Sequence, residues 1–443
     1  MYLPDKFGRL NIVRFASVIS IVGAGMQTGA RSLGVLLAGR AIGGIACGII
    51  VALCPLYASE ISPPHVRGRV GGLYNININV SYSLTEWMGL GFSYIKSGQL
   101  KWRIFVGLQL VCAAIMLAGS IWMPESPRWL VMQGHHEEAL TVLEKLHGSH
   151  LPLASDDDVP FFRREFNQIE AQIKLEQQTR QLGIVAILKR PSYRRRLFII
   201  TFFFAFQQLT AIIPLQNYQV ILYQSLGISG KLPLVLVGVW GTLGVIFSCG
   251  GAFFFDRLGR RKSFFISMSG VLVGSIMLVA FWARYEHSNN TNKTLGSLAL
   301  WSMFTYLVGY AWILNSFGYA YTPEILPMEI RATGVAVGFA TLNAIIIMLV
   351  QVTPIAIDAI SWRYFLIFVF TDLIFVIVFY FQFPETANIP LEEVAALFGD
   401  KVAVTLSEAI KLEETGQEVH VEDVTPQKIA RLGTDRRSDT TFE

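Results

Sequence analysis

Two adjacent glutamines, Gln207 and Gln208, stand early in a long apolar run of this 443-residue chain. A polar side chain in apolar surroundings is costly unless it lines a cavity or finds a partner. An amide donates and accepts hydrogen bonds without carrying a charge, so adjacent amides suit an uncharged polar ligand. Asn217 follows in the same run and could line the same cavity. The alternative for each residue is helix–helix packing.

Charged residues recur in two similar loops far apart in the chain, Asp5-Lys6-Phe7-Gly8-Arg9 and Asp256-Arg257-Leu258-Gly259-Arg260. Carboxylates and guanidinium groups in such loops can form charge-assisted pairs across the two halves of the chain. The alternative is that these charges only fix membrane topology and loop folding. We find no nucleotide-binding loop, metal-ligand cluster or catalytic-triad spacing, so we expect no enzyme, no cofactor and no metal site.

The elements that must position these residues are membrane helices. The chain is 53% hydrophobic and 15% charged, whereas about a quarter of the residues of a soluble domain are charged. Apolar runs of roughly twenty residues can cross a bilayer core, and helices are the default because backbone polar groups need internal partners in lipid. Ten spans are predicted, at residues 11–30, 35–57, 73–95, 104–123, 196–223, 233–255, 264–283, 298–322, 333–358 and 363–383.

The basic loops give the orientation of these spans. If the ten spans alternate in direction, the basic loops fall on one side, which is then the cytoplasm, and both termini lie there. The loop at 285–296 lies on the opposite side and holds glycosylation sequons at Asn289 and Asn292. The net charge of +4 is therefore a sign of topology, and we expect no nucleic-acid partner.

The second half of the chain repeats the first. The repeated patterns are Tyr57-x-x-Glu60-Ile61-x-Pro63-x-x-x-Arg67 with Tyr321-x-x-Glu324-Ile325-x-Pro327-x-x-x-Arg331, and Pro124-Glu125-Ser126 with Pro384-Glu385-Thr386. In the second repeat two spans precede the charged loop, but in the first repeat none do. We therefore expect the chain to be truncated at its N-terminus by about two helices.

Four parts follow from this organisation. They are an incomplete N-terminal bundle of four helices at 1–130, an intracellular helical linker at 131–194, a C-terminal bundle of six helices at 195–390, and a mostly disordered cytoplasmic tail at 391–443. In the linker, Phe162, Phe166, Ile169 and Ile173 are spaced for one broad apolar face. This spacing predicts short helices that pack under the membrane domain.

Five motifs occur in a specific order, namely Arg40-x-x-Gly43-Gly44-x-x-x-Gly48, Pro55-Leu56-Tyr57-x-x-Glu60, Arg67-Gly68-Arg69, Pro124-Glu125-Ser126-Pro127-Arg128-Trp129-Leu130 and Gln207-Gln208-Leu209-Thr210. With these motifs the chain resembles a sugar porter of the major facilitator superfamily, fungal members most of all, from residue 5 to about 395. The resemblance implies an all-α membrane fold with ten of the usual twelve helices in two pseudo-symmetric bundles. The glycines of the first motif would let helices approach closely in lipid.

The resemblance also implies roles for individual residues. It assigns a cytoplasmic gate, which holds the inner side shut, to Asp5, Arg9, Glu60, Arg67, Glu125, Arg128, Asp256, Arg260, Glu324, Arg331 and Glu385. It implies that Gln207 and Gln208 bind sugar hydroxyls, and further substrate contacts are expected from Asn75, Tyr319, Asn217 and Asn343. The chain departs from the family where Ala211-Ile212-Ile213 replaces a usual Gly-Ile-Asn.

Arg40 is the candidate for proton coupling. In proton-coupled members of the family an arginine at this position pairs with an aspartate on a first helix that this sequence lacks. The other acidic candidates are Asp372, in the last predicted span, and Glu86.

The predicted function is that of a secondary carrier. It would move a sugar or a related polyol by alternating access, as a facilitator or proton symporter, as a monomer in the lipid bilayer of the plasma membrane. The alternatives are a transporter-like sugar sensor and a non-functional fragment of a carrier.

Overall fold

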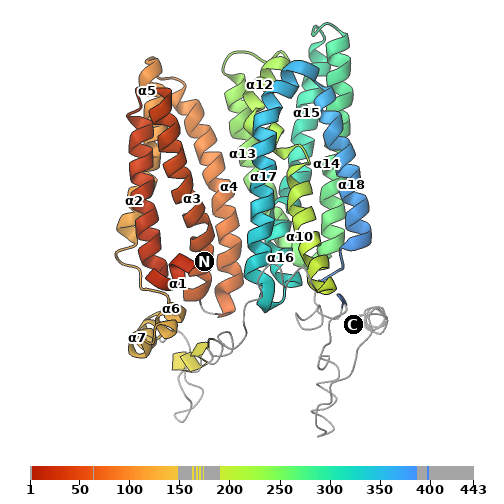
Figure 1. The fold of residues 1–443 in the computed structure, drawn as a ribbon. Helices are drawn as coiled ribbons and strands as arrows, with labels where there is room; N and C mark the ends of the chain where they lie inside the picture. Colours follow the sequence, from red (N-terminus) through yellow and green to blue (C-terminus); the bar gives the residue numbers. More distant parts are fainter. Residues whose placement is uncertain are drawn as a thin grey trace, which may run out of the picture. The chain divides into compact units, whose positions relative to one another are not determined.

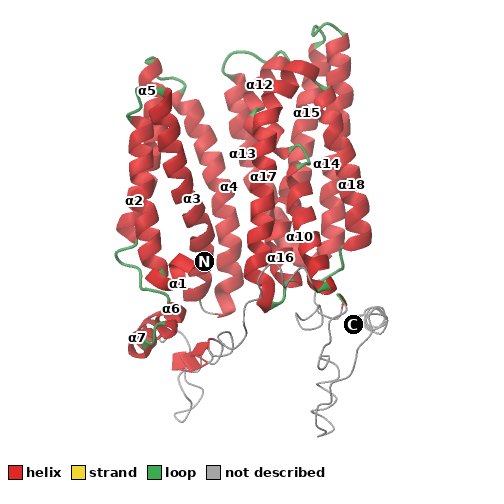
Figure 2. Cartoon of the chain, viewed as in Figure 1, coloured by secondary structure: helices red, strands yellow, loops and turns green. Residues whose placement is uncertain are grey.

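The computed structural model describes residues 2–62, 64–147, 162–163, 166–167, 169–170, 173, 190–386 and 397–398. In these ranges the chain forms helices, turns and connecting loops and no strand (Figure 2). It divides into two compact units, Met1–Arg180 and Gln181–Glu443. The domain boundaries predicted at residues 130, 194 and 390 stay predictions.

Nine helices of the described ranges are long and apolar enough to cross a membrane, and each of them overlaps one of the ten predicted spans. The tenth predicted span, 73–95, overlaps α4 (Pro64–Phe92), a helix of 29 residues. At about 1.5 Å per residue a helix of that length also exceeds the thickness of a bilayer core. The all-α membrane architecture predicted from the sequence is therefore confirmed.

In the first unit, α4 and three further long helices run along one another (Figure 1), namely α2 (Arg9–Thr28), α3 (Leu33–Ile61) and α5 (Gly98–Gly119). The short helices α1 (Tyr2–Phe7), α6 (Pro127–Met132) and α7 (His136–His147) lie at one end of them. Helix α2 packs against both α3 and α5. A Cβ added at Gly23 would lie 2.7 Å from the backbone nitrogen of Gly43, so small residues do bring α2 and α3 together there. A Cβ at Gly44 or Gly48 would meet nothing within 4 Å in the described ranges, so for these two glycines the prediction of close helix approach was wrong.

The short helices after α5 carry their own small core. Phe166 and Ile173 are buried against residues of α6 and α7, and Phe162 and Ile169 pack at the edge of the same cluster. The apolar spacing in the linker therefore does correspond to a packed face, as its period predicted. Most of the predicted tail, 391–443, lies outside the described residues, but the ring of Phe398 lies 4.6 Å from the guanidinium of Arg196.

The second unit contains α10 (Pro191–Gln208), α11 (Ile212–Asn217), α12 (Gln219–Ser225), α13 (Leu232–Leu258), α14 (Arg260–His287), α15 (Lys293–Gly309), the π-helix η1 (Tyr310–Leu314), α16 (Asn315–Ile325), α17 (Met328–Ile360) and α18 (Arg363–Gln382). Helices α14 and α15 approach each other closely where a Cβ at Gly274 would lie 2.5 Å from the backbone nitrogen of Tyr306. A cluster of phenylalanines, with Phe264 and Phe379 stacked at 3.5 Å, fills the space between α14 and α18.

Two of the membrane-spanning segments in this unit are irregular. The span at Pro191–Asn217 is interrupted between α10 and α11, where Ala211 adopts a left-handed backbone with φ 73°. The span that begins with α15 changes to a π-helix at Tyr310–Leu314 before α16 continues it. Irregular backbone at membrane depth exposes polar groups and often marks a functional site. These two segments meet at Gln207.

Candidate functional site: two charge clusters and a polar helix break

In the first unit, Arg9 is the centre of a cluster of charged side chains. Its guanidinium is 3% exposed and donates two hydrogen bonds to Glu60, at 3.0 and 3.2 Å. It also lies 3.0 Å from the carboxylate of Asp5. The hydroxyl of Ser126 donates to Glu60 at 2.5 Å. This fork-shaped pairing fixes the loop before α2 to the end of α3.

The second unit repeats this cluster. Arg260 donates to Glu324 through Nη2 at 2.6 Å and through Nε at 3.2 Å. The hydroxyl of Thr386 donates to Glu324 at 2.5 Å, as that of Ser126 does to Glu60 in the first unit. The internal repeat seen in the sequence is therefore a repeat of contacts as well.

A second carboxylate in each cluster binds the backbone at the start of a helix. Glu125 accepts hydrogen bonds from the backbone N–H groups of Arg9 and Leu10, at 3.1 and 3.2 Å. Glu385 accepts from Arg260 and Arg261, both at 2.8 Å. Each carboxylate thus satisfies two of the free N–H groups at a helix N-terminus and meets the positive end of its dipole.

Glycines precede both helices because the backbone turns there in the left-handed region. Gly8 has φ 95° before α2 and Gly259 has φ 81° before α14. Nearby, the hydroxyl of Tyr57 donates to the carbonyl of Pro124 at 2.5 Å, and Tyr321 donates to Pro384 at 2.9 Å. The two clusters share the left-handed glycine, the capping carboxylate, the arginine–glutamate pair and the tyrosine contact.

Each of these contacts joins residues of the same unit, either the first or the second. The gate predicted between the two halves therefore stays a prediction, although the residues assigned to it do form ordered clusters. Arg331 donates to the backbone carbonyl of Leu326 at 3.2 Å, and burial lowers the pKa of Arg331. A guanidinium with a lowered pKa is still protonated at neutral pH, so Arg331 remains a cation. Arg128 lies in α6, and the side chains of Arg67 and Asp256 lie outside the described residues.

The break between α10 and α11 gathers polar side chains in the second unit. Gln207 is 1% exposed, and its Nε2 donates to the carbonyl of Leu314 in the π-helix at 2.8 Å. Its Oε1 is buried without a hydrogen-bond partner among the described residues. Gln208, at the end of α10, is 6% exposed. A buried amide oxygen without a partner is costly, so it is available to accept a bond from a ligand hydroxyl.

Further polar contacts hold this break in place. The hydroxyl of Thr210 donates to the carbonyl of Gln207 at 2.8 Å, and Tyr306 on α15 donates to the Thr210 hydroxyl at 3.0 Å. Thr371 on α18 donates to the carbonyl of Leu209 at 2.7 Å. Two carbonyls at the helix break, those of Gln207 and Leu209, therefore accept hydrogen bonds from threonine hydroxyls, and Tyr306 in turn holds one of these hydroxyls.

Asn217 lines a cavity of about 400 Å³ together with Gln216, Tyr218 and Gln219. Gln219 is 2% exposed, and neither polar atom of its amide has a partner in the part of the chain that the structure describes. The hydroxyl of Tyr218 donates to the carbonyl of Val350 on α17 at 2.7 Å. This cavity offers the donors and acceptors that an uncharged polar ligand needs.

The other predicted contacts fall on neighbouring surfaces. The ring of Tyr319 is half-exposed and lies 6.2 Å from Phe204, one turn before Gln208, and 5.6 Å from Phe339 on α17. Asn343, one turn after Phe339, is exposed and donates to its own helix at Phe339. Tyr319 therefore lies near the glutamine pair because its ring packs against Phe204. Asn343 is connected to the same aromatic cluster through Phe339.

Two further residues that the sequence analysis assigned to substrate contact or proton coupling are not among the described residues of the helix break. The side chain of Asn75 lies outside the described residues. Arg40 is exposed on α3.

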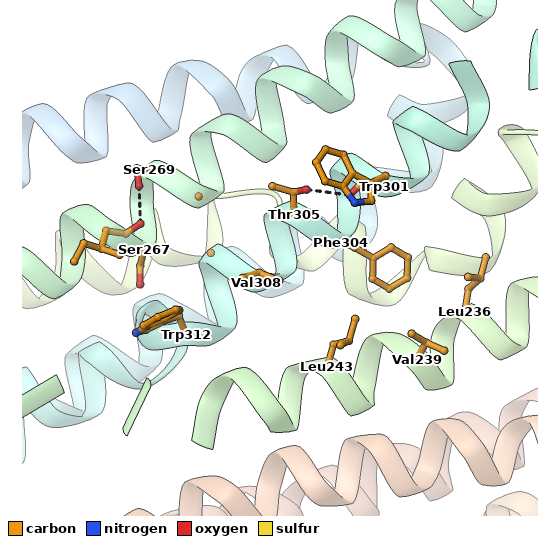
Figure 3. Close-up of a pocket in the computed structure, with 13 residues that line it drawn as sticks. Leu236, Val239, Leu243, Ser267, Ser269, Trp301, Phe304, Thr305, Val308 and Trp312 are labelled. Atoms are coloured by element: carbon orange, nitrogen blue, oxygen red, sulfur yellow. Dashed lines mark hydrogen bonds between the residues drawn. The ribbon is translucent and has the colours of Figure 1, made fainter. Parts of the chain in front are cut away.

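A larger cavity, of about 610 Å³, opens between α13, α14 and α15 and does not contain the glutamine pair (Figure 3). Its walls are apolar and aromatic, with Phe304, Trp301 and Trp312 among them. Ser267 Oγ and Trp312 Nε1 are buried there without partners among the described atoms. Two isolated polar atoms do not match a ligand that carries several hydroxyls, so we place the candidate site at the helix break.

Sequence reasoning missed several residues of these sites. Ser126 and Thr386 stand in the repeated Pro-Glu-Ser and Pro-Glu-Thr motifs, so the repeat could have pointed to them. Tyr306, Thr371 and Gln219 gave no such signal, because nothing in their spacing indicates that they face the helix break.

Known proteins resemble this chain both in fold and in sequence. The structure of the proton:xylose symporter XylE, a major facilitator superfamily protein of E. coli, bound to 6-bromo-6-deoxy-D-glucose matches with a TM-score of 0.69 and 21% identity, over 90% of this chain and 85% of that one. The MFS-type transporter criB of Aspergillus cristatus is 29% identical over 399 residues, which are 90% of this chain and 80% of the relative. Sugar transporter STL1 of Saccharomyces cerevisiae is 28% identical over 407 residues, which are 90% of this chain and 69% of the relative.

The profile of the family described as sugar (and other) transporter matches residues 1–398. The repeated charge clusters, the broken helix and this match over most of the chain lead to one conclusion: the chain belongs to the sugar (and other) transporter family.

Proposed function

We propose that this chain is a secondary carrier that moves a sugar or a related polyol across a membrane by alternating access. The observation that carries the proposal is the buried Oε1 of Gln207 at a helix break, which has no hydrogen-bond partner among the described residues, in a chain of the sugar (and other) transporter family. A carrier needs no covalent step, only a site for its substrate and two arrangements of its halves. Relatives named as sugar transporters support the choice of substrate class.

The arrangement of Gln207 suits a hydroxyl-rich ligand. Because Leu314 holds its Nε2, the amide cannot flip, and its oxygen can only accept a hydrogen bond. Gln208 and the amides near Asn217 add donors and acceptors on the same span. None of these side chains is charged, so the site favours a neutral ligand over an ionic one.

Uptake of labelled sugars tests this proposal. The chain would be expressed in a yeast host that lacks its own hexose carriers, with D-glucose, D-xylose and sorbitol as probes. Gln208→Ala should raise the KM for the transported probe about tenfold, as the loss of one or two ligand hydrogen bonds predicts. The matched control is Gln224→Ala, which removes an exposed glutamine on α12 and should leave KM as it is. Absence of uptake for every sugar and polyol, with the protein present at the membrane, would refute the proposal.

We also propose that the carrier is a monomer in the plasma membrane with both termini in the cytoplasm. The basic loops support this orientation because positive residues are retained on the cytoplasmic side. The opposite loop offers two sequons, at Asn289 and Asn292, and both asparagines are exposed. Asn292 caps α15 through its side-chain oxygen, so Asn289 is the better acceptor for a glycan.

Digestion with an endoglycosidase tests the orientation. It should increase the gel mobility of the wild type but not that of Asn289→Gln. A chain that carries no glycan when expressed through the secretory pathway would count against the orientation. Light scattering in detergent tests the oligomeric state, and a dimer mass would contradict the monomer.

A further inference from the structure

Asp372 is a buried carboxyl in the middle of α18. It is 0% exposed, and its Oδ2 accepts one hydrogen bond, from the hydroxyl of Ser275 on α14 at 3.3 Å. Its Oδ1 is buried and has no hydrogen-bond partner among the described residues. An ionised carboxylate usually accepts several hydrogen bonds, so one long bond from a hydroxyl is poor compensation for its burial.

Among the described residues, no cation faces this carboxyl from the helices that pack most extensively on α18. These helices are α10, α14 and α17, and their stretches 197–208, 263–283 and 332–357 contain no Lys, Arg, His, Asp or Glu. The phenol of Tyr306 on α15 lies within electrostatic range of this carboxyl, and Tyr310 lies within range of that phenol. An isolated carboxylate in such surroundings takes up a proton instead of remaining charged.

The carboxyl is connected to the helix break that carries the candidate substrate site. Thr371, its neighbour on α18, donates to the carbonyl of Leu209 in the break at 2.7 Å. Tyr306 donates to Thr210 at 3.0 Å, and Thr210 donates to the carbonyl of Gln207 at 2.8 Å. Movement of the break between α10 and α11 must therefore disturb the residues around Asp372.

We propose that Asp372 binds a proton inside the second unit and that loss of this proton accompanies movement of the α10–α11 break. The carboxyl is neutral when the break is packed as in this structure. It becomes a carboxylate when the break moves and water or another donor reaches Oδ1. Only the coupling of proton loss to movement of the break rests on the proposed function. The carboxyl can bind a proton whether or not the chain moves sugar.

Transport by the purified 443-residue chain in liposomes tests the coupling. Two assays use the same labelled sugar: counterflow without a proton gradient, and accumulation driven by an inward proton gradient. Asp372→Asn keeps the size of the side chain but cannot ionise. We expect it to lower gradient-driven accumulation about tenfold or more and counterflow less than about threefold, a difference within the range of allosteric coupling.

The matched control is Asp358→Asn, which neutralises an exposed carboxyl at the end of α17 and should behave as the wild type in both assays. Equal accumulation by wild type and Asp372→Asn would overturn the coupling. So would a wild type that shows counterflow but no accumulation. A wild type without counterflow for any sugar or polyol would instead count against the proposed carrier function.

Infrared difference spectroscopy tests proton binding without any transport. A protonated carboxyl has a C=O stretching band that the carboxylate lacks. The wild type in liposomes should show such a band that disappears on alkalinisation, and Asp372→Asn should lack it. Identical difference spectra for wild type and variant would overturn the proton site, whatever the transport assays show.

Discussion

The two carboxylates that cap helices give the most direct test of how the charge clusters stabilise this fold. In the second unit Glu385 accepts two backbone hydrogen bonds at 2.8 Å, from the first residues of α14. Glu385→Gln keeps the shape of the side chain but removes its charge. It also replaces one acceptor by an NH₂ group, which faces one of the two backbone donors.

The magnitude follows from these two losses. A backbone donor left without a partner costs about 1–3 kcal/mol, and a lost charge at a helix N-terminus costs about 0.3–1 kcal/mol. Because Glu385 is half-buried, we take the lower part of the first range. We expect Glu385→Gln to lower the free energy of unfolding by about 2 kcal/mol, which is about a thirtyfold change in the equilibrium constant.

The measurement is a reversible denaturant titration of the purified protein in detergent, followed by tryptophan fluorescence. The control is Glu286→Gln in the last turn of the same helix, where an exposed carboxylate meets the negative end of the dipole. That change should cause no loss of stability and could raise it slightly. Glu125→Gln in the first unit should repeat the result, since its bonds have the same pattern. Equal stability of Glu385→Gln and the control would refute the capping role.

Five glycine or alanine changes give three further predictions, and the free energy of unfolding of each variant is measured by the same titration. Gly8→Ala should lower the free energy of unfolding by about 2 kcal/mol or more, because φ is 95° and the new Cβ would lie 2.8 Å from a carboxylate oxygen. Its control is Gly134→Ala, where φ is 82° but no described atom lies within 4 Å, and this change should lower the free energy of unfolding by about 1 kcal/mol. Gly274→Ala should lower the free energy of unfolding by about 3 kcal/mol, because its Cβ would lie 2.5 Å from the backbone of the next helix. Its control is Gly244→Ala, whose Cβ would meet no described atom within 4 Å, and this change should not destabilise the protein. Ala211→Gly should raise stability by about 0.5 kcal/mol, since it relieves a left-handed alanine at φ 73° but loosens the unfolded chain. A loss on Ala211→Gly, or equal losses within either glycine pair, would contradict these assignments.

The sequence was sufficient for the membrane helices and for the central arginine and glutamates of each charge cluster. Long apolar runs predict spans because lipid leaves the backbone no other partner, and the repeated Tyr–Glu and Pro-Glu patterns placed Glu60 and Glu324 in equivalent positions. What the sequence could not predict is which partner each carboxylate takes. Glu125 and Glu385 bind backbone N–H groups, and backbone donors leave no mark in the pattern of side chains.

The helix break could be predicted only in part. The glutamine pair was visible, but the departure at Ala211 looked like the loss of a glycine and of a ligand residue. In the structure Ala211 keeps the left-handed conformation that a glycine would favour, because Thr210, Thr371 and Tyr306 bind the surrounding backbone or hydroxyls. Tertiary contacts here override a local preference, and contacts of this kind cannot be derived from spacing alone.

The comparison of the two repeats separates what the fold requires from what is particular to the second half. The ion pairs, the helix caps and the tyrosine contacts occur in both units, so they belong to the shared scaffold. Asp372 does not. Cys112 lies as far before Pro124 as Asp372 lies before Pro384, and Ala24 lies as far after Gly8 as Ser275 lies after Gly259. The first unit thus packs the same pair of helices, α2 and α5, without a buried acid or its hydroxyl partner. A buried carboxyl that the scaffold does not need, beside a helix break that carries the substrate candidates, is best explained by a role in the transport cycle and not in folding.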